Sequence, residues 1–469
     1  MATPDAPPST MHEKTAPTDS VRLRSITILG LFDLFDHHLT FDEENRILIV
    51  YGPNGVGKTT ILRMVANLFE SNFSYFRKVA FKTFTIELSD KSRLEIAKNV
   101  PDSLEESEED DSLHEGASNL TLTLRLPGQD SLEFPAPQFH PDPRQFSLHE
   151  FERYLPVRRL TAKSWRDLRT NEILSLPELA QRFGEDFPPL RGSVQKPPEL
   201  DSFLRKLPVH LIETQRLLSL PVRPSTRAQT MGADEHTSTV IRFSQDLSTR
   251  IQRELARSAQ LSQQLDRSFP SRLLDQELPS SVTEDQIRHK YLVQGDYRGR
   301  LMEAGLLDSA DEVALPEREL GDIERRVLWA YLNDVDQKLG VFSPLLAKIE
   351  LLRDIINSRF LFKHLFTDKV SGFRIETRQG SNVSPDSLSS GEQHELVLAY
   401  QLLFMVHPGS LVLIDEPEIS LHVSWQQKFL QDLERIAQTA DLDFLIATHS
   451  PQIIHDRWEL AASLTSDNS

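Results

Sequence analysis

Hydrophobic residues follow two different spacings along this chain. Between residues 21 and 135, short apolar runs and apolar–polar alternation predict strands at 25–29, 46–51, 80–88, 93–98 and 119–126. In the middle of the chain, apolar residues recur every three or four positions, which is the spacing of helices with one buried face. Short apolar runs return at 411–414 and 444–448. The pattern predicts an α/β head in two parts, 21–215 and 367–469, separated by a helical insertion at 216–366.

Three apolar series define the helices expected in the insertion. They are Val240, Phe243, Leu247, Ile251, Leu255, Leu261 and Leu265, then Leu320, Ile323, Val327, Tyr331, Val335 and Leu339, then Leu345, Ile349, Leu352, Ile356 and Phe360. A helix of about 30 residues is about 45 Å long, so the insertion is expected to be a short projection. The segment 136–207, which is interrupted by prolines, is expected to form short helical pieces.

Residues 52–59, Gly-Pro-Asn-Gly-Val-Gly-Lys-Thr, match the phosphate-binding pattern G-x-x-x-x-G-K-[ST] at every position. The match follows a predicted strand and precedes an apolar-periodic helix, an arrangement that aims backbone N–H groups at a phosphate. Lys58 would reach the β- and γ-phosphates of ATP, and Thr59 would be a ligand of Mg²⁺. The residues expected to bind the nucleotide are Gly52, Asn54, Gly55, Gly57, Lys58, Thr59 and Thr60.

Three further segments, more than 300 residues after the P-loop, carry polar residues at the ends of apolar elements. Residues 388–393, Leu-Ser-Ser-Gly-Glu-Gln, begin a predicted helix that runs to about residue 404. The predicted strand 411–414 ends in Asp415 and Glu416, and the strand 444–448 ends in His449. Each segment alone is common on a solvated surface. In this order behind a complete P-loop, they indicate the second half of the same site.

These segments resemble the signature motif, the Walker B strand and the switch histidine of ABC-type ATPases. The resemblance implies that Asp415 holds Mg²⁺ through water, that Glu416 polarises the attacking water and that His449 contacts the γ-phosphate. It also implies that Ser390 and Gly391 cap ATP bound to an opposite subunit, so the protein is expected to be at least a dimer. Transporter ATPases usually carry glycine at the position of Ser390.

A glutamine after another predicted strand completes the expected site. Residues 209–216 read Val-His-Leu-Ile-Glu-Thr-Gln-Arg, a short strand followed by the helical insertion. SMC-like ATPases carry, in this context, a glutamine that helps to hold Mg²⁺ and the attacking water, and Gln215 matches that position. The resemblance implies an ABC-type P-loop ATPase head with an antiparallel β lobe and a helical, coiled-coil-like insertion.

The residues after the Walker B strand narrow the resemblance. The stretch Asp-Glu-Pro-Glu-Ile-Ser-Leu-His at 415–422 resembles that of the SMC/RecF/OLD-like, AAA-family ATPases of bacterial anti-phage defence. This group includes the overcoming-lysogenization nucleases, the PtuA proteins of Septu and retron systems, and the AriA proteins of PARIS systems. The resemblance implies a sensor or gate that controls a separate effector, a TOPRIM or HNH nuclease, in response to a phage-encoded trigger. Because only residues 450–469 follow His449, no nuclease domain is expected there.

Two other functions stay open, a DNA repair or maintenance ATPase of the RecF/SMC type and, less in keeping with the insertion, an ABC transporter subunit. The net charge of −18 disfavours a surface made for non-specific DNA binding but leaves room for a local basic channel. The best candidate for DNA contact is a group of basic residues near Tyr154 and Trp165. Its members are Arg153, Arg158, Arg159, Lys163, Arg166 and Arg169.

The remaining expectations concern the surroundings of the head. The segment 102–115 holds eight acidic residues and neither lysine nor arginine, so it is expected to be a solvated loop. Residues 1–20 are expected to be a disordered lead-in. The chain has no cysteine, no secretory signal pattern and no apolar run of membrane-spanning length, which favours a cytoplasmic protein.

Overall fold

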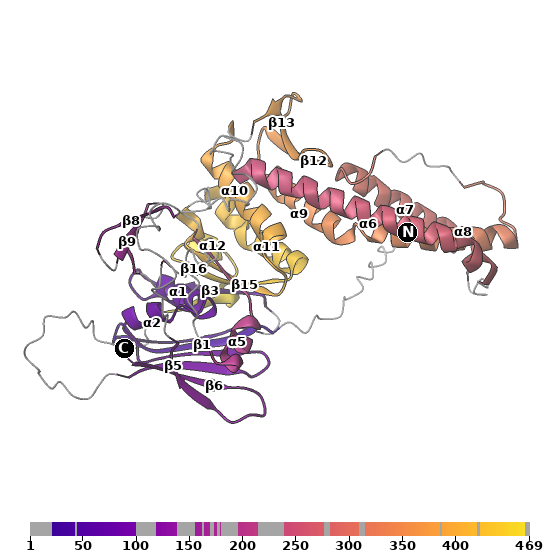
Figure 1. Ribbon diagram of the computed structural model, residues 1–469. Helices are drawn as coiled ribbons and strands as arrows, with labels where there is room; N and C mark the ends of the chain where they lie inside the picture. Colours follow the sequence, from indigo (N-terminus) through magenta and orange to yellow (C-terminus); the bar gives the residue numbers. More distant parts are fainter. Residues whose placement is uncertain are drawn as a thin grey trace, which may run out of the picture.

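The computed structural model has an α/β head from which helices project to one side (Figure 1). It describes residues 21–42, 45–99, 119–137, 155–161, 164–168, 173–175, 179, 196–213, 239–275, 282–308, 315–384, 387–419 and 423–464. Residues 1–20, the acidic segment 102–115 and Gln215 lie outside this part of the chain, so the expectations about them stay predictions. Among the described helices, none has a stretch long and apolar enough to cross a membrane.

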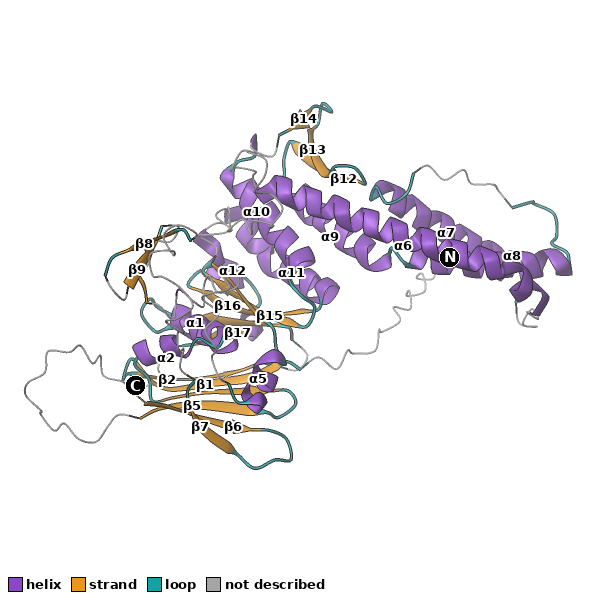
Figure 2. Cartoon of the chain, viewed as in Figure 1, coloured by secondary structure: helices purple, strands orange, loops and turns teal. Residues whose placement is uncertain are grey.

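A parallel sheet forms the centre of the head (Figure 2). Its described strands, in spatial order, are β11 (Val209–Glu213), β15 (Ser410–Asp415), β16 (Leu442–Thr448), β3 (Ile47–Tyr51) and β17 (Ala461–Ser463). Strand β3 therefore pairs with β16 although the whole insertion separates them in the sequence. The beginning and the end of the chain build one sheet.

Side chains of the central strands alternate between two hydrophobic cores. Leu411 and Leu413 of β15 lie in the core shared with the β lobe, whereas Val412 and Ile414 lie in the core shared with the C-terminal helices. Successive residues of a strand point to opposite faces, and both faces of this sheet are covered. This is why the strands are continuous apolar runs, the pattern from which the sequence predicted them.

An antiparallel sheet forms the β lobe. Its described strands, in spatial order, are β2 (Phe35–Thr40), β1 (Leu23–Leu31), β4 (Thr83–Leu88), β5 (Arg93–Asn99), β6 (Asn119–Arg125) and β7 (Leu132–Pro135). Helices α1 (Lys58–Phe69), α2 (Phe73–Lys78) and α5 (Pro198–Arg205) pack against it in one core. The sequence prediction missed β2 and β7. Most residues of β2 are polar, and only its inward positions His37 and Leu39 are buried.

The described helices of the insertion are α6 (Thr239–Asp275), α7 (Glu284–Glu303), α8 (Asp322–Gly340) and α9 (Ser343–Arg359). Figure 1 shows them lying side by side and extending away from the head. Asp334 of α8 is buried and accepts a hydrogen bond of 2.7 Å from Arg272 of α6, and Gln294 of α7 donates to the backbone carbonyl of Leu332. These polar contacts tie α6 and α7 to α8. The apolar series predicted α6, α8 and α9 but not α7.

A three-stranded antiparallel sheet follows the helices of the insertion. It consists of β12 (Lys363–Asp368), β13 (Gly372–Thr377) and β14 (Asn382–Val383), so β12 begins before residue 366, where the insertion was predicted to end. Leu365 and Thr367 are the buried positions of β12, a two-residue alternation typical of a strand. Gly372 has a φ of 77°, and a Cβ there would lie 1.8 Å from the carbonyl oxygen of Ser244. The turn between β12 and β13 is therefore in direct contact with α6.

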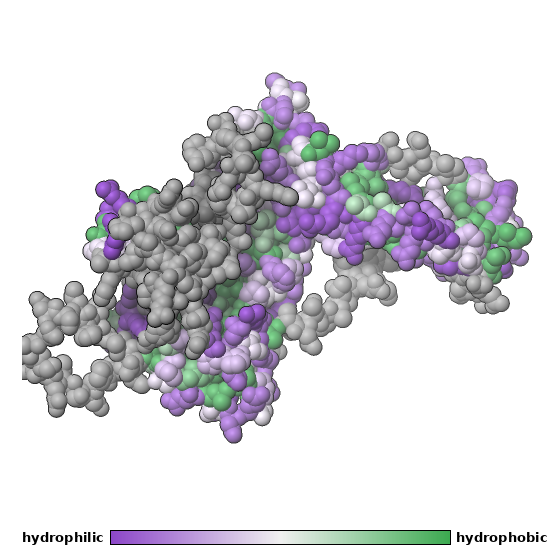
Figure 3. All heavy atoms as spheres, viewed as in Figure 1, coloured by the Kyte–Doolittle hydropathy of each residue, from purple (hydrophilic) through white to green (hydrophobic). Residues whose placement is uncertain are grey.

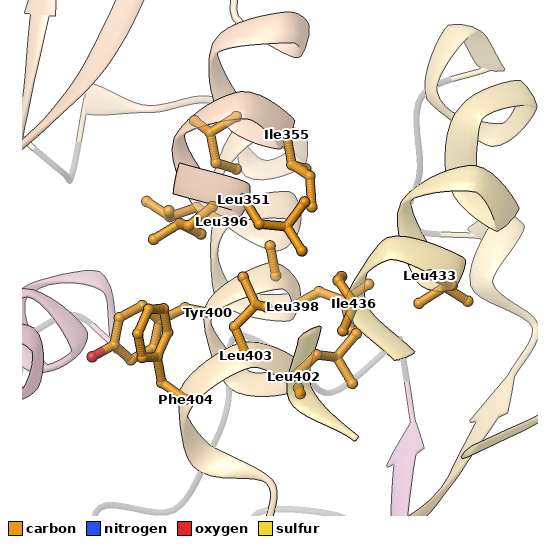
Figure 4. Close-up of a cluster of buried hydrophobic side chains, with 14 of the residues drawn as sticks. Leu351, Ile355, Leu396, Leu398, Tyr400, Leu402, Leu403, Phe404, Leu433 and Ile436 are labelled. Carbon is orange, nitrogen blue, oxygen red and sulfur yellow. The ribbon is translucent and has the colours of Figure 1, made fainter. Parts of the chain in front are cut away.

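The C-terminal part of the head adds α10 (Ser390–Tyr400), a π-helical turn (Gln401–Met405), α11 (Val423–Ala440) and α12 (Pro451–Ile454). Figure 4 shows apolar side chains of α9, α10, the π-helical turn and α11 meeting in one cluster, among them Leu351, Leu396, Leu403 and Ile436. The helix predicted from 388 to about 404 is thus present, with its last turn widened. The last helix of the insertion packs directly on the helix that begins at the signature residues.

The prediction of short helices across 136–207 was wrong in part. Helix α5 confirms it near the end, but the other elements described there are the strands β8 (Val157–Arg159), β9 (Ser164–Asp167) and β10 (Ile173–Ser175). Their alternation is visible only in pairs of residues such as Trp165 and Asp167, both buried. Strands of three or four residues contain too few positions for a period to be recognised from sequence.

Candidate nucleotide-binding site

The P-loop connects β3 to α1 through two glycines in the left-handed conformation. The φ angles of Gly55 and Gly57 are 90° and 100°, which residues with a Cβ rarely adopt. A Cβ on Gly57 would lie 2.4 Å from Cδ2 of Leu31, whereas a Cβ on Gly55 would have no atom within 4 Å. The loop is packed against the β lobe at Gly57 and borders open space at Gly55, as a phosphate cradle requires.

His37 of β2 holds the P-loop from the side of the β lobe. Its Nε2 lies 3.0 Å from the backbone carbonyl oxygen of Val56 and donates to it, because a carbonyl can only accept. Burial lowers the pKa of His37, which favours the neutral ring. The ring of Phe35 stacks on His37 with the ring centroids 5.8 Å apart. Sequence reasoning missed His37, although the alternation of Phe35, His37 and Leu39 was a signal for an inward-facing strand position.

Lys58 begins α1 and is buried within the loop. Its Nζ donates to the carbonyl oxygens of Gly52 and Pro53, at 2.8 and 2.9 Å. The first turn of α1 contains no acidic residue, so no carboxylate within that turn offsets the positive end of the helix dipole. An ammonium group and a helix N-terminus at the end of one glycine loop form a site for phosphate oxygens.

Thr59 and Asp415 are in direct contact. The hydroxyl of Thr59 donates to Oδ1 of Asp415 at 3.0 Å, across 356 positions of sequence. A hydroxyl and a carboxylate are the hard oxygen ligands that suit Mg²⁺, which usually keeps several waters and takes its other ligands from phosphates. The donor set at this point therefore fits the ion. Strand β11, which leads towards Gln215, ends at Glu213 in register with Asp415.

Glu416 and His449 meet at the ends of neighbouring strands. Glu416 has a φ of 46°, and its amide donates to the carbonyl oxygen of Ala447 at 2.9 Å. This left-handed residue turns the chain sharply after β15, a strained conformation that is frequent at functional sites. Oε1 of Glu416 lies 3.7 Å from Nδ1 of His449, and both side chains are partly exposed. The structure thus brings together the two residues predicted to act on the attacking water and the γ-phosphate.

Glu418 is a site residue to which sequence reasoning gave no role. Its Oε1 lies 3.0 Å from Nδ1 of His449, closer than any oxygen of Glu416 among the described ion pairs. The sequence showed Glu418 within the stretch 415–422, but only the turn after β15 reveals which histidine it reaches. The signal available from sequence was a second carboxylate two residues after a Walker B glutamate.

Ser390 and Gly391 form the first turn of α10 but are not near the P-loop of their own chain. Ser389 caps the helix, accepting from the amide of Glu392 at 3.3 Å, while its own amide donates to the Glu392 carboxylate at 2.8 Å. Ser390 is exposed, and a Cβ on Gly391 would lie 3.7 Å from the ring of Trp425. Figure 1 shows α10 well apart from α1. The signature residues thus begin a capped helix, and Ser390 is exposed at its first turn.

A buried ionic cluster joins the insertion to α10 and α11. The guanidinium of Arg359, at the end of α9, forms an ion pair with Asp432 and lies 3.7 Å from Oε1 of Glu395. Burial raises the pKa of Glu395 to about 7 and also raises that of Asp432. Oε2 of Glu395 is buried and has no hydrogen-bond partner in the described part of the chain. This arrangement favours a neutral Glu395 beside the Arg359–Asp432 pair.

The basic and aromatic residues considered for DNA contact are only partly described. Trp165 is fully buried, so its ring is not available to stack on a base. Arg158 and Arg166 are exposed and lie opposite each other in register on β8 and β9. Arg153, Tyr154, Lys163 and Arg169 lie outside the described residues.

Together, the glycine loop, the Thr59–Asp415 contact and the Glu416–His449 pair lie at the carboxyl ends of parallel strands. They define a P-loop nucleotide-binding protein. A family model described as "AAA domain, putative AbiEii toxin, Type IV TA system" matches residues 190–455, more than half of the chain, and the chain belongs to this family. The matched segment contains the signature, Walker B and switch-histidine residues, while the P-loop precedes it.

Curated relatives match over a short segment. The chain is 34% identical over 92 residues to a "Retron Ec83 probable ATPase" of Escherichia coli, a match that covers 17% of each chain. It is 32% identical over 88 residues to a "Retron Vc95 probable ATPase" of Vibrio cholerae serotype O1 biovar El Tor, covering 16% of this chain and 17% of the relative. The matches thus span less than a fifth of the length of these relatives.

Solved structures of SMC head domains are also similar over most of the chain. The Smc head domain of Pyrococcus furiosus, bound to the C-terminal domain of ScpA, has a TM-score of 0.34 at 11% identity and covers 92% of this chain and 91% of its own. The SMC head domain of Thermotoga maritima has a TM-score of 0.31 at 11% identity, covering 94% and 92%.

Proposed function

We propose that this protein hydrolyses ATP with Mg²⁺ and uses the nucleotide cycle to control a separate effector of an anti-phage defence system. The observation that carries the proposal is the hydrogen bond between Thr59 and Asp415. It places side by side the two residues that would hold Mg²⁺, one from the P-loop helix and one from the Walker B strand. A P-loop in which these two ligands were far apart would bind a nucleotide without an organised metal site.

The side chains of the site have distinct tasks in this reaction. Lys58 binds phosphate oxygens, with its ammonium group leaving the carbonyls of the loop. Thr59 and Asp415 would hold Mg²⁺, which would neutralise charge on the phosphates when bound. Glu416 orients the attacking water and accepts its proton, and His449 places a ring nitrogen towards the terminal phosphate. Phosphoryl transfer depends mainly on such positioning and electrostatic stabilisation, so no covalent step with the protein is needed.

Ser390 and Gly391 complete the site of a second copy in this proposal. Three observations support the arrangement. Ser390 is exposed, the capping box of Ser389 and Glu392 fixes the first turn of α10, and this turn lies apart from the P-loop of the same chain. A fixed helix N-terminus that lies apart from the P-loop of its own chain is suited to contact a phosphate held by a partner. ATP would then close two copies together.

The defence role rests on relatives and on the insertion. The family description names a toxin system, and two retron ATPases resemble the chain. Helices α6 to α9 extend from the head, and Leu274, Leu292 and Ile323 are exposed apolar residues on them. Figure 3 shows apolar patches among polar surface along this insertion. A TOPRIM or HNH nuclease held there, and released after a phage-encoded trigger alters nucleotide turnover, is the effector that we propose.

The test is Glu416→Gln in the full chain. Removing the carboxylate that accepts the proton should lower the rate of ATP hydrolysis by about 10²- to 10⁴-fold while ATP binding is retained, because Lys58, Thr59 and Asp415 are unchanged. Phosphate release measures turnover, and a fluorescent ATP analogue measures binding. The control is Glu317→Gln, which makes the same chemical change at an exposed position on the insertion. Wild-type single-turnover rates in Glu416→Gln would exclude this role for Glu416.

A further inference from the structure

The carboxylate of Glu418 accepts hydrogen bonds from the end of β16, next to His449, and from His449 itself. Glu418 lies in the 3₁₀ turn Pro417–Ile419 that follows β15. Its Oε1 accepts from the hydroxyl of Thr448 at 2.7 Å and from the amide of His449 at 3.0 Å, and it lies 3.0 Å from Nδ1 of the same histidine. One oxygen atom thus contacts the backbone and the ring of His449 together.

This geometry sets which nitrogen of His449 faces Glu418. Oε1 accepts from the amide of His449, and Nδ1 faces the same oxygen at ion-pair distance, where a hydrogen on Nδ1 is favoured. The ring is therefore oriented by Glu418, and Nε2 is the nitrogen left to face a phosphate oxygen. Because that oxygen only accepts, the contact needs hydrogen on Nε2 as well as on Nδ1. Glu416 does not have this role, because its Oε1 lies 3.7 Å from Nδ1, beyond hydrogen-bond distance.

The position of Glu418 is itself fixed from another element. Gln426 of α11 donates to the backbone carbonyl of Glu418 at 3.1 Å, and both residues are buried. Thr448 also accepts from the amide of Ser450 at 3.0 Å, which extends the network past His449. The orientation of His449 is therefore linked to α11 and to the Walker B turn.

Burial of this carboxylate is costly for stability alone. The side chain of Glu418 is 6% exposed, and its Oε2 is buried without a hydrogen-bond partner among the described residues. An ionisable group in such surroundings usually lowers stability unless it is fully paired, and an apolar residue of similar volume would avoid the penalty. A buried group that is only partly satisfied calls for an explanation outside packing.

We infer that Glu418 is a positioning residue for ATP hydrolysis, acting through the ring of His449, an inference that rests on the proposed function. Glu418 does not touch the reacting atoms. It holds Nδ1 and the amide of His449 so that Nε2 faces the terminal phosphate, and Glu416 remains the residue that accepts the proton of water. The two carboxylates of one turn thus serve different steps.

The experiment compares Glu418→Met, which keeps the volume and removes the acceptor, with Glu418→Gln, which keeps an acceptor oxygen. Glu418→Met should lower kcat about 10- to 100-fold, the equivalent of one hydrogen bond to a charged group, with KM and ATP affinity within about two-fold of wild type. Glu418→Gln should keep kcat within about three-fold of the wild-type value. Adding Glu418→Met to His449→Ala should cause no further loss, because the ring through which Glu418 acts is absent. The control is again Glu317→Gln.

Amide hydrogen exchange at His449 in the nucleotide-free full chain separates this inference from the proposed function. Glu418→Met should speed that exchange at least about 10-fold, whether or not the protein hydrolyses ATP. If the wild-type protein fails to hydrolyse ATP, the proposed function is wrong. If amide exchange at His449 is the same in Glu418→Met as in wild type, Glu418 does not anchor His449, and the inference is overturned. Equal losses of kcat in the Gln and Met variants, or a further loss in the double variant, would overturn the positioning role. If Glu418→Met does not fold, Glu418→Gln alone provides the test. A loss of kcat above 10-fold in Glu418→Gln, with the amide of His449 still protected from exchange, would overturn the positioning role.

Discussion

Gly57→Ala should destabilise the nucleotide-free protein far more than Gly55→Ala, although both change a P-loop glycine with a positive φ. The left-handed backbone costs a residue with a Cβ roughly 1–2 kcal/mol at either position. At Gly57 the new methyl group would also lie 2.4 Å from Cδ2 of Leu31. Leu31 is fully buried in the core of the β lobe and cannot move aside without disturbing it. Overpacking of this kind costs about 1–3 kcal/mol.

The expected losses are therefore about 2–5 kcal/mol for Gly57→Ala and about 1–2 kcal/mol for Gly55→Ala, where no atom lies within 4 Å of the new Cβ. Urea unfolding followed by circular dichroism, without nucleotide, measures both. Leu31→Ala provides a double-mutant cycle. In the double variant the methyl group at position 57 has room, so the combined loss should be about 1–3 kcal/mol smaller than the sum.

Equal losses at the two glycines, together with strictly additive effects of Gly57→Ala and Leu31→Ala, would refute this reasoning. Such a result would mean that the P-loop is not packed against the β lobe at Gly57. It would also remove the reason for assigning a structural role to the neighbouring contact between His37 and Val56.

Two further predictions concern the subunit seam and the buried cluster. Lys58→Ala should lose ATP affinity and Ser390→Arg should block turnover while sparing ATP binding by the single chain. Mixing the two inactive variants should restore some ATPase activity, and no recovery at any ratio, with hetero-assembly verified, would contradict the composite site. Burial raises the pKa of Glu395 from 4.5 to about 7, so the folded protein binds this proton more tightly than the unfolded chain. The stability of wild type should therefore fall by up to roughly 3 kcal/mol relative to Glu395→Gln as pH rises from about 4.5 through 7. Urea titrations of both proteins across this range check it, and parallel pH profiles would contradict the assignment.

Local sequence was sufficient for the P-loop and for the central strands. Phosphate binding by a glycine loop depends on residues within one turn, so the eight positions 52–59 contain the information. Strands β15 and β16 are buried on both faces, and continuous apolar runs therefore identified them. The long helices of the insertion were visible for a similar reason, since an apolar stripe repeats over several turns. Helix α7 was not, because its apolar residues do not keep that spacing.

Contacts between distant segments could not be read in this way. No local period shows that His37 reaches the carbonyl of Val56, or that Arg359 at the end of the insertion lies beside Glu395 and Asp432. These contacts depend on the order of strands in the sheets and on the packing of α9 against α10 and α11. The short strands β8 to β10 were missed because three or four residues do not establish an alternation.

The sequence by itself determined the chemistry of the site, namely a phosphate loop and a set of carboxylate, hydroxyl and imidazole groups at strand ends. The tertiary structure decided which of them meet. Parallel pairing of β3, β16 and β15 brings Thr59 to Asp415. The sharp turn at Glu416 places Glu418 beside the ring of His449. The physical reason is that local burial and chemistry determine the residue types along the chain. A hydrogen bond between residues hundreds of positions apart forms only after the sheet has brought their strands together.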